Sequence, residues 1–229
     1  MKKIGIIFAM KEELEKTLEK ITYIKKHKVY ELVIYECKYN DNKCYLVESG
    51  IGKVNAARTT QLLITKMNVD CILNIGVAGS ISKEVKKCDI VIANNLVQHD
   101  FDLTSFNHEK GLIPNVGKNI PCDEKMLSLA QKVKLDAKVF VGTIASGDIF
   151  ITEEKMASKI HNKFNALCVE MEGAAIAQVS YLCNIPFIII RSISDSPYEE
   201  NNELTFDEFL KISSDMVAKF VVQLLKKIK

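Results

Sequence analysis

Residues 186–195 read Pro-Phe-Ile-Ile-Ile-Arg-Ser-Ile-Ser-Asp, an apolar run that ends in charged and hydroxyl side chains. A short run that is apolar on both faces is typical of a strand covered on two sides. Further runs rich in Ile and Val occur at 3–9, 71–77, 89–93, 138–145 and 166–170. Segments with helical periodicity lie between them, and this alternation predicts an α/β fold with a central sheet.

The helical segments and one hairpin complete the expected fold. Residues 29–38 and 43–48 flank Asn40-Asp41-Asn42, a turn-forming cluster, so they should pair as antiparallel strands and make the sheet mixed. Residues 98–121 fit neither period, and we expect a long loop there that belongs to a site or an interface. Helices are expected at 11–21, 54–67, 123–134, 152–161, 171–183 and 206–228.

Composition excludes several classes of protein. The 229 residues are 48% hydrophobic with a formal net charge of +2, and no stretch resembles a linker, so we expect one domain over 1–229 and no nucleic-acid partner. The longest apolar runs are too short to cross a membrane, which favours a cytoplasmic protein. Seven Cys without a C-x-x-C pair are interpreted as small core residues, and the four His share no ligand spacing with them, so no metal site is expected.

Polar groups follow several of the expected strands. Glu12-Glu13, Ser146-Gly147-Asp148, Glu170-Met171-Glu172 and Arg191 to Asp195 all lie at such strand ends, where open α/β sheets bind ligands. Each has a structural explanation when taken singly, because acids favour helix N-termini and Arg191 could pair with Asp195. Neither glycine-bearing turn, at 49–53 or 76–80, carries a phosphate-loop or dinucleotide fingerprint, so no cofactor is expected.

Taken together, these segments resemble one family. The motifs are Ile4-Gly5-Ile6-Ile7-x-Ala9-Met10-x-Glu12-Glu13, Ser49-Gly50-Ile51-Gly52-Lys53, Gly76-x-Ala78-Gly79, Ser146-Gly147-Asp148, Val169-Glu170-Met171-Glu172 and Ser192-x-Ser194-Asp195. Their order and approximate spacing are similar to those of the 5′-methylthioadenosine/S-adenosylhomocysteine nucleosidases, within the nucleoside phosphorylase-like superfamily. The resemblance runs from about residue 3 to the helix at 206–209. It implies a three-layer α/β/α fold around a mixed sheet.

The resemblance also implies roles for single residues. Glu13 would activate the attacking water with Arg191 nearby, and Glu172 would hold the ribose hydroxyls. Asp195, held by Ser194, would donate a proton to adenine N7. Further substrate-binding residues would be Phe150 and Ile151 at the adenine and Met10, Ile51, Met171 and Phe206 around the sugar and thioalkyl group, together with Ala78 and Gly79. Leu103, Phe106 and Pro114 would reach into the neighbouring subunit's site and make the enzyme a homodimer.

The implied reaction is hydrolysis of the N-glycosidic bond of 5′-methylthioadenosine and S-adenosylhomocysteine, and also of 5′-deoxyadenosine. Such a reaction needs an acid on the leaving group and a base for water. A purine nucleoside phosphorylase is disfavoured, because an acid would repel phosphate at Glu13. An aminodeoxyfutalosine hydrolase stays open, because an apolar 5′ pocket constrains size poorly. A non-catalytic nucleoside-binding module is disfavoured by the retention of Glu13, Glu172, Arg191 and Asp195, while Val77 replaces a Ser of some family members.

Overall fold

The computed structural model describes residues 1–198 and 206–228, with the side chains of 206–208 left out. The strands are β1 (Lys3–Phe8), β2 (Tyr23–Val29), β3 (Leu32–Tyr39), β4 (Asn42–Glu48), β5 (Cys71–Ser80), β6 (Ile90–Gln98), β7 (Ile120–Pro121), β8 (Val139–Ser146), β9 (Ala166–Glu170) and β10 (Phe187–Asp195). The helices are α1 (Lys11–Leu18), α2 (Lys53–Leu62), α3 (Glu124–Ala130), α4 (Glu154–Phe164), α5 (Gly173–Leu182) and α6 (Phe206–Leu225), with the short elements η1 (Leu63–Met67) and η2 (Thr104–Phe106).

The strands form one mixed sheet, as the sequence predicted. Its order is β2-β3-β4-β1-β5-β10-β6-β8-β9, and β9 returns to pair with β5. Pairs β1–β4, β1–β5, β5–β10, β6–β8 and β8–β9 are parallel, whereas β2–β3, β3–β4, β6–β10 and β5–β9 are antiparallel. Strands β5, β10, β6, β8 and β9 therefore close into a ring. Gly79 of β5 consequently faces Asp195 of β10 on one side and Val169 of β9 on the other.

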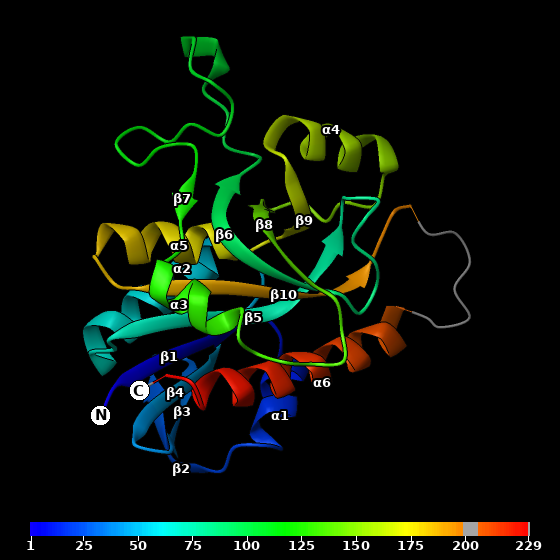
Figure 1. Ribbon diagram of the computed structural model, residues 1–229. Helices are drawn as coiled ribbons and strands as arrows, with labels where there is room; N and C mark the ends of the chain where they lie inside the picture. The colour runs from blue at the N-terminus through cyan, green and yellow to red at the C-terminus, as the bar shows by residue number, and fades with distance from the viewer. Residues whose placement is uncertain (199–205, 229) are drawn as a thin grey trace.

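Helices cover the sheet on both faces (Figure 1). Helix α6 packs on β10, β5 and α1, while α2 and α5 pack against each other on the opposite side. The Ile-rich centre of β10 explains this arrangement, because Ile188, Ile189 and Ile190 are fully buried and point alternately to the two faces. The continuous apolar run at 186–193 is thus a strand buried on both sides, as predicted.

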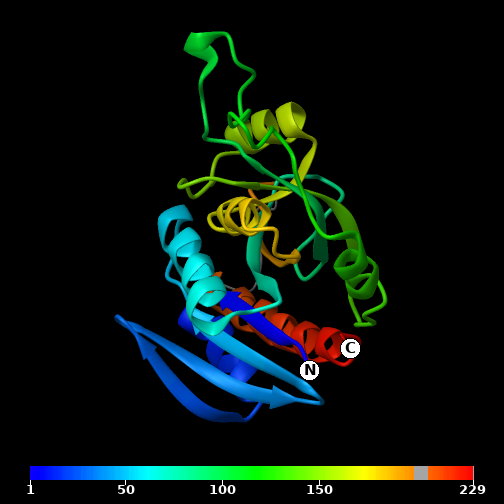
Figure 2. The same ribbon diagram turned by 90° about the vertical axis from the view of Figure 1, so that its left-hand side faces the viewer.

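Besides the two-residue β7, strand β2 is the described strand of the sheet that the sequence pattern did not predict. Its sequence, Tyr-Ile-Lys-Lys-His-Lys-Val, is mostly exposed and has no buried face, since it lies at the edge of the sheet. The run predicted as one strand at 29–38 is broken at Tyr30, which has a φ of 56° and turns the chain from β2 into β3. The resulting hairpin lies at the opposite end of the molecule from the 98–121 loop (Figure 2).

The predicted helices are present, with shifted ends. Helix α1 ends at Leu18 rather than 21, and α5 begins at Gly173 rather than 171 because Met171 and Glu172 continue from the end of β9 into the cavity described below. Within the described residues, no helix is long and apolar enough to cross a membrane. Five of the seven cysteines are buried as predicted, namely Cys37, Cys44, Cys71, Cys122 and Cys168, whereas Cys88 and Cys183 are half-buried.

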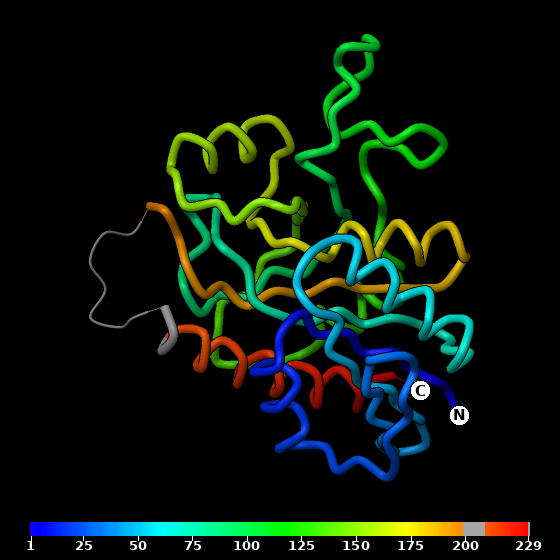
Figure 3. Tube along the Cα trace, turned by 180° about the vertical axis from the view of Figure 1, so that it is seen from behind, coloured from blue at the N-terminus to red at the C-terminus, as the bar shows by residue number. Residues whose placement is uncertain are grey.

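The predicted irregular segment at 98–121 is a loop apart from η2 and the two-residue strand β7. It projects away from the body of the molecule, beyond α4 and α5 (Figures 1 and 3). Phe106 near its tip is 74% exposed. The interpretation of this segment as part of a site or an interface stays a prediction.

Candidate active site

A cavity opens where β1, β5, β9 and β10 end, and it gathers most of the residues singled out in the sequence. Four carboxylates line it, from Glu13 on α1, Glu170 at the end of β9, Glu172 after β9 and Asp195 at the end of β10. The remaining lining residues are Ala9, Met10, Ile51, Val77, Ala78, Gly79, Ile149, Phe150, Ile151, Val169, Met171 and Ser194. The closed ring of strands produces this convergence, because it brings β9 and β10 to the same point of β5.

Glu13 lies at the floor of the cavity and is held by backbone amides. Its Oε2 accepts hydrogen bonds from the amides of Ala9 at 3.0 Å and Met10 at 3.1 Å, and its Oε1 accepts one from Val77 at 2.9 Å. Burial raises the pKa of Glu13, while the charge of Arg191 and these amides oppose the rise. The carboxylate is thus fixed in one orientation in a place with little water.

Gly76 makes room for that carboxylate. A Cβ at this position would lie 2.7 Å from Glu13 Oε1, which is too close for two unbonded atoms. Gly76 is therefore required because a side chain at this position would clash with Glu13, and not because of its backbone dihedral angles. Val77 contributes its amide, so the hydroxyl of a Ser is not needed for this contact.

Glu172 lies at the start of α5 and is only 5% exposed. Its Oε1 accepts a hydrogen bond of 2.9 Å from the amide of Gly52. Among the described residues, no hydrogen bond to its Oε2 is found. Burial, with the neighbouring charge of Glu170, raises the pKa of Glu172 to about 7. A buried carboxylate with spare acceptor capacity suits a pair of sugar hydroxyls, which are donors.

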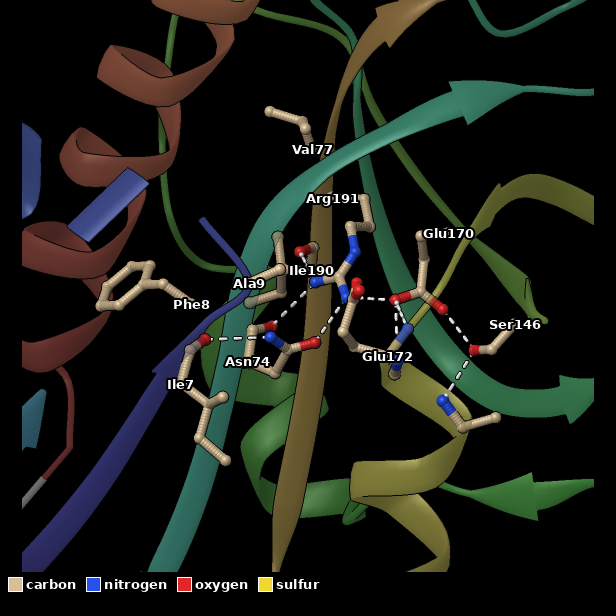
Figure 4. Close-up of polar contacts among 12 residues, drawn as sticks. Ile7, Phe8, Ala9, Asn74, Val77, Ser146, Glu170, Glu172, Ile190 and Arg191 are labelled. Carbon is tan, nitrogen blue, oxygen red and sulfur yellow. Dashed lines mark hydrogen bonds and ion pairs between the residues drawn. The ribbon is translucent and has the colours of Figure 1, made fainter. Parts of the chain in front are cut away.

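Arg191 does not line the cavity, and its guanidinium lies between Asn74 and Glu170 (Figure 4). The side chain is 1% exposed and forms an ion pair with Glu170 rather than with Asp195. Its guanidinium also donates to the carbonyl of Ile190 at 3.0 Å and to Oδ1 of Asn74 at 2.5 Å. The charge of Arg191 lowers the pKa of both Glu13 and Glu172 against the effect of burial. In this structure Arg191 therefore acts on the carboxylates electrostatically.

Glu170 is the site residue to which the sequence interpretation gave no role. It accepts hydrogen bonds from the amides of Glu172 at 3.0 Å and Gly173 at 2.7 Å, from the hydroxyl of Ser146 and from Arg191. This carboxylate fixes the turn that carries Glu172 and satisfies the first amides of α5. The only sequence signal was a second acid two positions before Glu172, which has the same appearance as an ordinary acidic helix start.

Asp195 stands on the other side of the cavity. Its Oδ1 accepts a hydrogen bond of 2.7 Å from the Ser194 hydroxyl, as the sequence comparison predicted. Burial raises the pKa of Asp195, and Ser194 and the charge of Lys87 oppose the rise. A Cβ on Gly79 would lie 2.8 Å from Asp195 Oδ2, so this glycine keeps the second oxygen clear.

Apolar side chains form the rest of the cavity wall. Phe150 and Ile51 line it while remaining 61% and 53% exposed, whereas Ile151 is 4% exposed. Two residues predicted for this wall, Met10 and Met171, also line it. The flat ring of Phe150 at the rim can stack on a heterocyclic base.

The remaining predicted residues lie elsewhere. Phe206 begins α6, but its side chain is outside the described residues. Leu103, Phe106 and Pro114 belong to the projecting loop and do not line the cavity of their own chain. No group of three or more potential metal ligands occurs among His, Cys, Asp and Glu of the described chain.

Comparisons with known proteins identify the class of protein. The family model described as "Phosphorylase superfamily" matches residues 3–226, so the chain is a protein of that superfamily. A 5′-methylthioadenosine/S-adenosylhomocysteine nucleosidase of Desulfotalea psychrophila is 37% identical over 99% of this chain and 98% of its own. The chain belongs to the 5′-methylthioadenosine/S-adenosylhomocysteine nucleosidase family.

Solved structures extend the comparison to three dimensions. A Campylobacter jejuni 5′-methylthioadenosine/S-adenosylhomocysteine nucleosidase is 37% identical, covers all of both chains and superposes with a TM-score of 0.94. The native structure described as futalosine hydrolase of Helicobacter pylori is 34% identical and superposes with a TM-score of 0.93, covering 99% of this chain and 98% of that one. Both structures share the fold, but their names differ in substrate.

Proposed function

We propose that this enzyme hydrolyses the N-glycosidic bond of 5′-methylthioadenosine and S-adenosylhomocysteine, releasing adenine and the free thioribose. The observation that carries the proposal is the meeting of Glu13, Glu172 and Asp195 in one apolar cavity. Cleavage of a glycosidic bond through a cation-like sugar needs an acid at the leaving group and a base for water. It also needs a grip on the sugar that tightens as charge develops.

Each carboxylate suits one of these tasks. Asp195 has a raised pKa and can keep a proton for adenine N7, which turns the purine into a neutral leaving group. Glu13, held by three backbone amides, can orient a water molecule and accept its proton. Glu172 has one oxygen committed to Gly52 and another available for the ribose hydroxyls.

The charge of the cavity favours water over phosphate as the attacking group. Among the described residues that line the cavity none is Lys or Arg, and Arg191, outside this lining, is paired with Glu170. A phosphate dianion beside Glu13 would meet a fixed negative charge without a compensating cation. The phosphorylase alternative is therefore disfavoured on electrostatic grounds.

The test is a product analysis. Purified protein is incubated with 5′-methylthioadenosine, with and without added phosphate, and adenine and the sugar product are followed by chromatography and mass. Hydrolysis predicts free methylthioribose under both conditions. A sugar phosphate formed only with phosphate would contradict the role of Glu13. Parallel incubations with S-adenosylhomocysteine, 5′-deoxyadenosine and aminodeoxyfutalosine rank the 5′ groups that the apolar wall accepts.

We also propose that the enzyme works as a homodimer, in which Leu103, Phe106 and Pro114 complete the neighbouring subunit's site. The support is the projecting loop with its exposed Phe106, together with the half-exposed cavity residues Ile51 and Phe150. Apolar side chains exposed at the rim of a cavity are partly solvated in a single chain. A loop from a second subunit would cover them and exclude water from the reaction.

A further inference from the structure

Three loops border the cavity, and polar contacts outside the cavity join them. Lys53 donates from Nζ to Asp100 Oδ1 at 2.7 Å and from its backbone amide to Asp148 Oδ1 at 2.8 Å. The backbone amide of Asp148 in turn donates to Asp100 Oδ2 at 3.0 Å. Each of the three residues thus contacts the other two. We call this group the Lys53–Asp100–Asp148 triad.

Each member of the triad belongs to a different segment of the site. Lys53 follows Ile51 and Gly52 at the start of α2, and Asp148 precedes the cavity residues 149–151. Asp100 stands at the base of the loop that projects from the molecule, directly after β6. None of the three lines the cavity itself. The triad is therefore placed to fix the spacing between segments, rather than to contact a bound nucleoside.

The ion pair between Lys53 and Asp100 is partly protected from solvent, whereas the two backbone contacts that involve Asp148 are exposed. The side chains of Lys53 and Asp100 are each 18% exposed, and Lys53 Nζ also donates to Gln98 Oε1 at 3.2 Å. Gln98 continues this chain by donating to Gln178 Oε1 on α5 at 2.7 Å. Ion pairs that are partly buried and fully hydrogen-bonded are screened less by salt and hold a more defined geometry than exposed ones.

One backbone contact connects the triad to the ribose carboxylate. Gly52, next to Lys53, donates its amide to Glu172 Oε1 and has a φ of 100°. A Cβ on Gly52 would lie 3.2 Å from Asp148 Oδ1, so the backbone of this turn is pressed against the triad. Movement of Lys53 relative to Asp148 would displace the amide that orients Glu172.

We infer that Lys53, Asp100 and Asp148 are positioning residues that hold the ribose side and the base side of the nucleoside cavity at their working separation. The inference rests on the proposed function for the identity of the substrate. The triad places Gly52 against Glu172 and sets the segment that carries Phe150 and Ile151. It also anchors the base of the 98–121 loop to both. Small errors in such spacing are costly, since a misplacement of about 1 Å can reduce rates about 100-fold.

The test compares Lys53→Met, Asp100→Asn and the double variant with the native enzyme, in steady-state kinetics with 5′-methylthioadenosine. Each single variant is expected to raise KM about tenfold with a smaller change in kcat, because both sides of the cavity contact the substrate before the bond breaks. The double variant is expected to be no worse than the more impaired single variant, because the residues act as one unit. Lys53→Arg restores the ion pair and is expected to recover most of the lost kcat/KM.

Matched controls come from a second ion pair, Lys20 with Asp215, which is 2.8 Å long, partly buried and outside the cavity. Lys20→Met and Asp215→Asn are expected to leave kcat and KM unchanged. Melting temperatures of all variants separate lost folding from lost positioning. Triad variants that lower only the melting temperature, with native KM and kcat, would overturn the inference.

Calorimetric titration with adenine keeps this result separate from the proposed function. If the native chain binds adenine but does not hydrolyse 5′-methylthioadenosine, the proposed function fails, and the adenine affinities of the variants still decide the inference. Weaker adenine binding by both single variants supports it, and unchanged binding overturns it. A native chain that neither binds adenine nor hydrolyses 5′-methylthioadenosine overturns the inference together with the proposed function.

Discussion

Asp195 is the residue whose chemistry is tested most directly. It shares its environment with a hydroxyl donor on one oxygen and the Cα of a glycine near the other. Asp195→Asn keeps the size of the side chain and removes the proton. We expect kcat to fall by about 10²–10⁴-fold with KM nearly unchanged, because proton donation matters in the transition state. Steady-state kinetics on 5′-methylthioadenosine measure this effect, and Asp41→Asn in the exposed β3–β4 turn is the control.

The pH profile adds a second readout for the same residue. An acid must be protonated to act, so native kcat should decline as the pH rises through the raised pKa of Asp195. The asparagine variant has no proton to lose there, and its residual rate should lack that decline. An Asp195→Asn enzyme with near-native turnover would rule out Asp195 as the acid.

Glu172 links activity to stability at the residue scale. Its pKa is about 7 in the folded protein against an ordinary value of 4.5, so the folded state holds the proton more tightly than the unfolded state. Glu172 therefore makes its full contribution to the free energy of unfolding below pH 4.5, and this contribution is lost as the pH rises through about 7. A shift of this size corresponds to about 3 kcal/mol as an upper bound.

Glu172→Gln is neutral at every pH and keeps an oxygen for the Gly52 amide. We expect the variant to unfold at a higher temperature than the native enzyme at pH 8 and at nearly the same temperature at pH 4.5, while losing most activity. Thermal denaturation at both pH values measures this. Glu84→Gln, an exposed change on the surface, should show no such difference. If Glu172→Gln and the native enzyme melted at the same temperature at pH 8, the charged form of Glu172 would not destabilise the folded state.

At the scale of elements, the end of β5 is the part of the sheet that decides the site. Gly76 and Gly79 face Glu13 and Asp195, and each leaves room for a carboxylate oxygen. In Gly79→Ala the new methyl group would push Asp195 from the place where Ser194 holds it. We expect kcat to fall about 100-fold while the fold is retained, since the misplaced acid no longer reaches N7.

Gly142→Ala is the matched control for that change. Gly142 also lies within a strand, and its new methyl group would meet the side chain of Leu167, outside the cavity. Gly142→Ala should lower the melting temperature without changing kcat or KM. If both alanine variants reduce the melting temperature and leave kcat intact, the steric role of Gly79 at Asp195 is wrong.

Most elements could be predicted from the sequence because burial on both faces leaves continuous apolar runs. This held for β10 and β1, whereas β2 failed because an exposed edge strand carries no apolar face. The short turn at Tyr30 was hidden, since a tyrosine with positive φ has no turn signal. The local sequence pattern thus predicts elements that are buried in the core and misses exposed strands and turns.

The site was predictable to the extent that its residues follow strands. Glu13, Glu172 and Asp195 were found because the carboxyl ends of strands converge in such folds, and the motif order added the rest. The burial of Arg191, its pairing with Glu170 and the contact of Lys53 with Asp100 were not predicted. These contacts join segments that are 21 and 47 residues apart, and no local pattern encodes which distant partner a charge will meet.

At the scale of the whole molecule, the closed ring of strands and the projecting loop are expected to serve different sites: the ring the cavity of its own chain, and the loop the cavity of a second subunit. The strands around the cavity bring the carboxylates together within one chain, whereas the loop projects from the body of the molecule, and its residues Leu103, Phe106 and Pro114 do not line that chain's own cavity. If the loop serves a second subunit, the cavity of each subunit depends on two chains. Phe106→Asp should then raise KM strongly in an enzyme whose own carboxylates are untouched.

A mixing experiment decides whether sites are shared between subunits. Asp195→Asn lacks the acid and Phe106→Asp has a raised KM, so each protein is expected to be nearly inactive at a substrate concentration near the native KM. In a mixed dimer, the chain with intact Asp195 receives an intact loop from its partner, so one of the two sites is native. Random exchange of equal amounts makes about half of the dimers mixed, so about a quarter of all sites become native. Activity should therefore rise on mixing to about a quarter of the native value, measured as adenine release after subunit exchange. If each loop instead served its own chain, every mixed dimer would keep two defective sites, and the activity of the mixture would stay at the average of its parts.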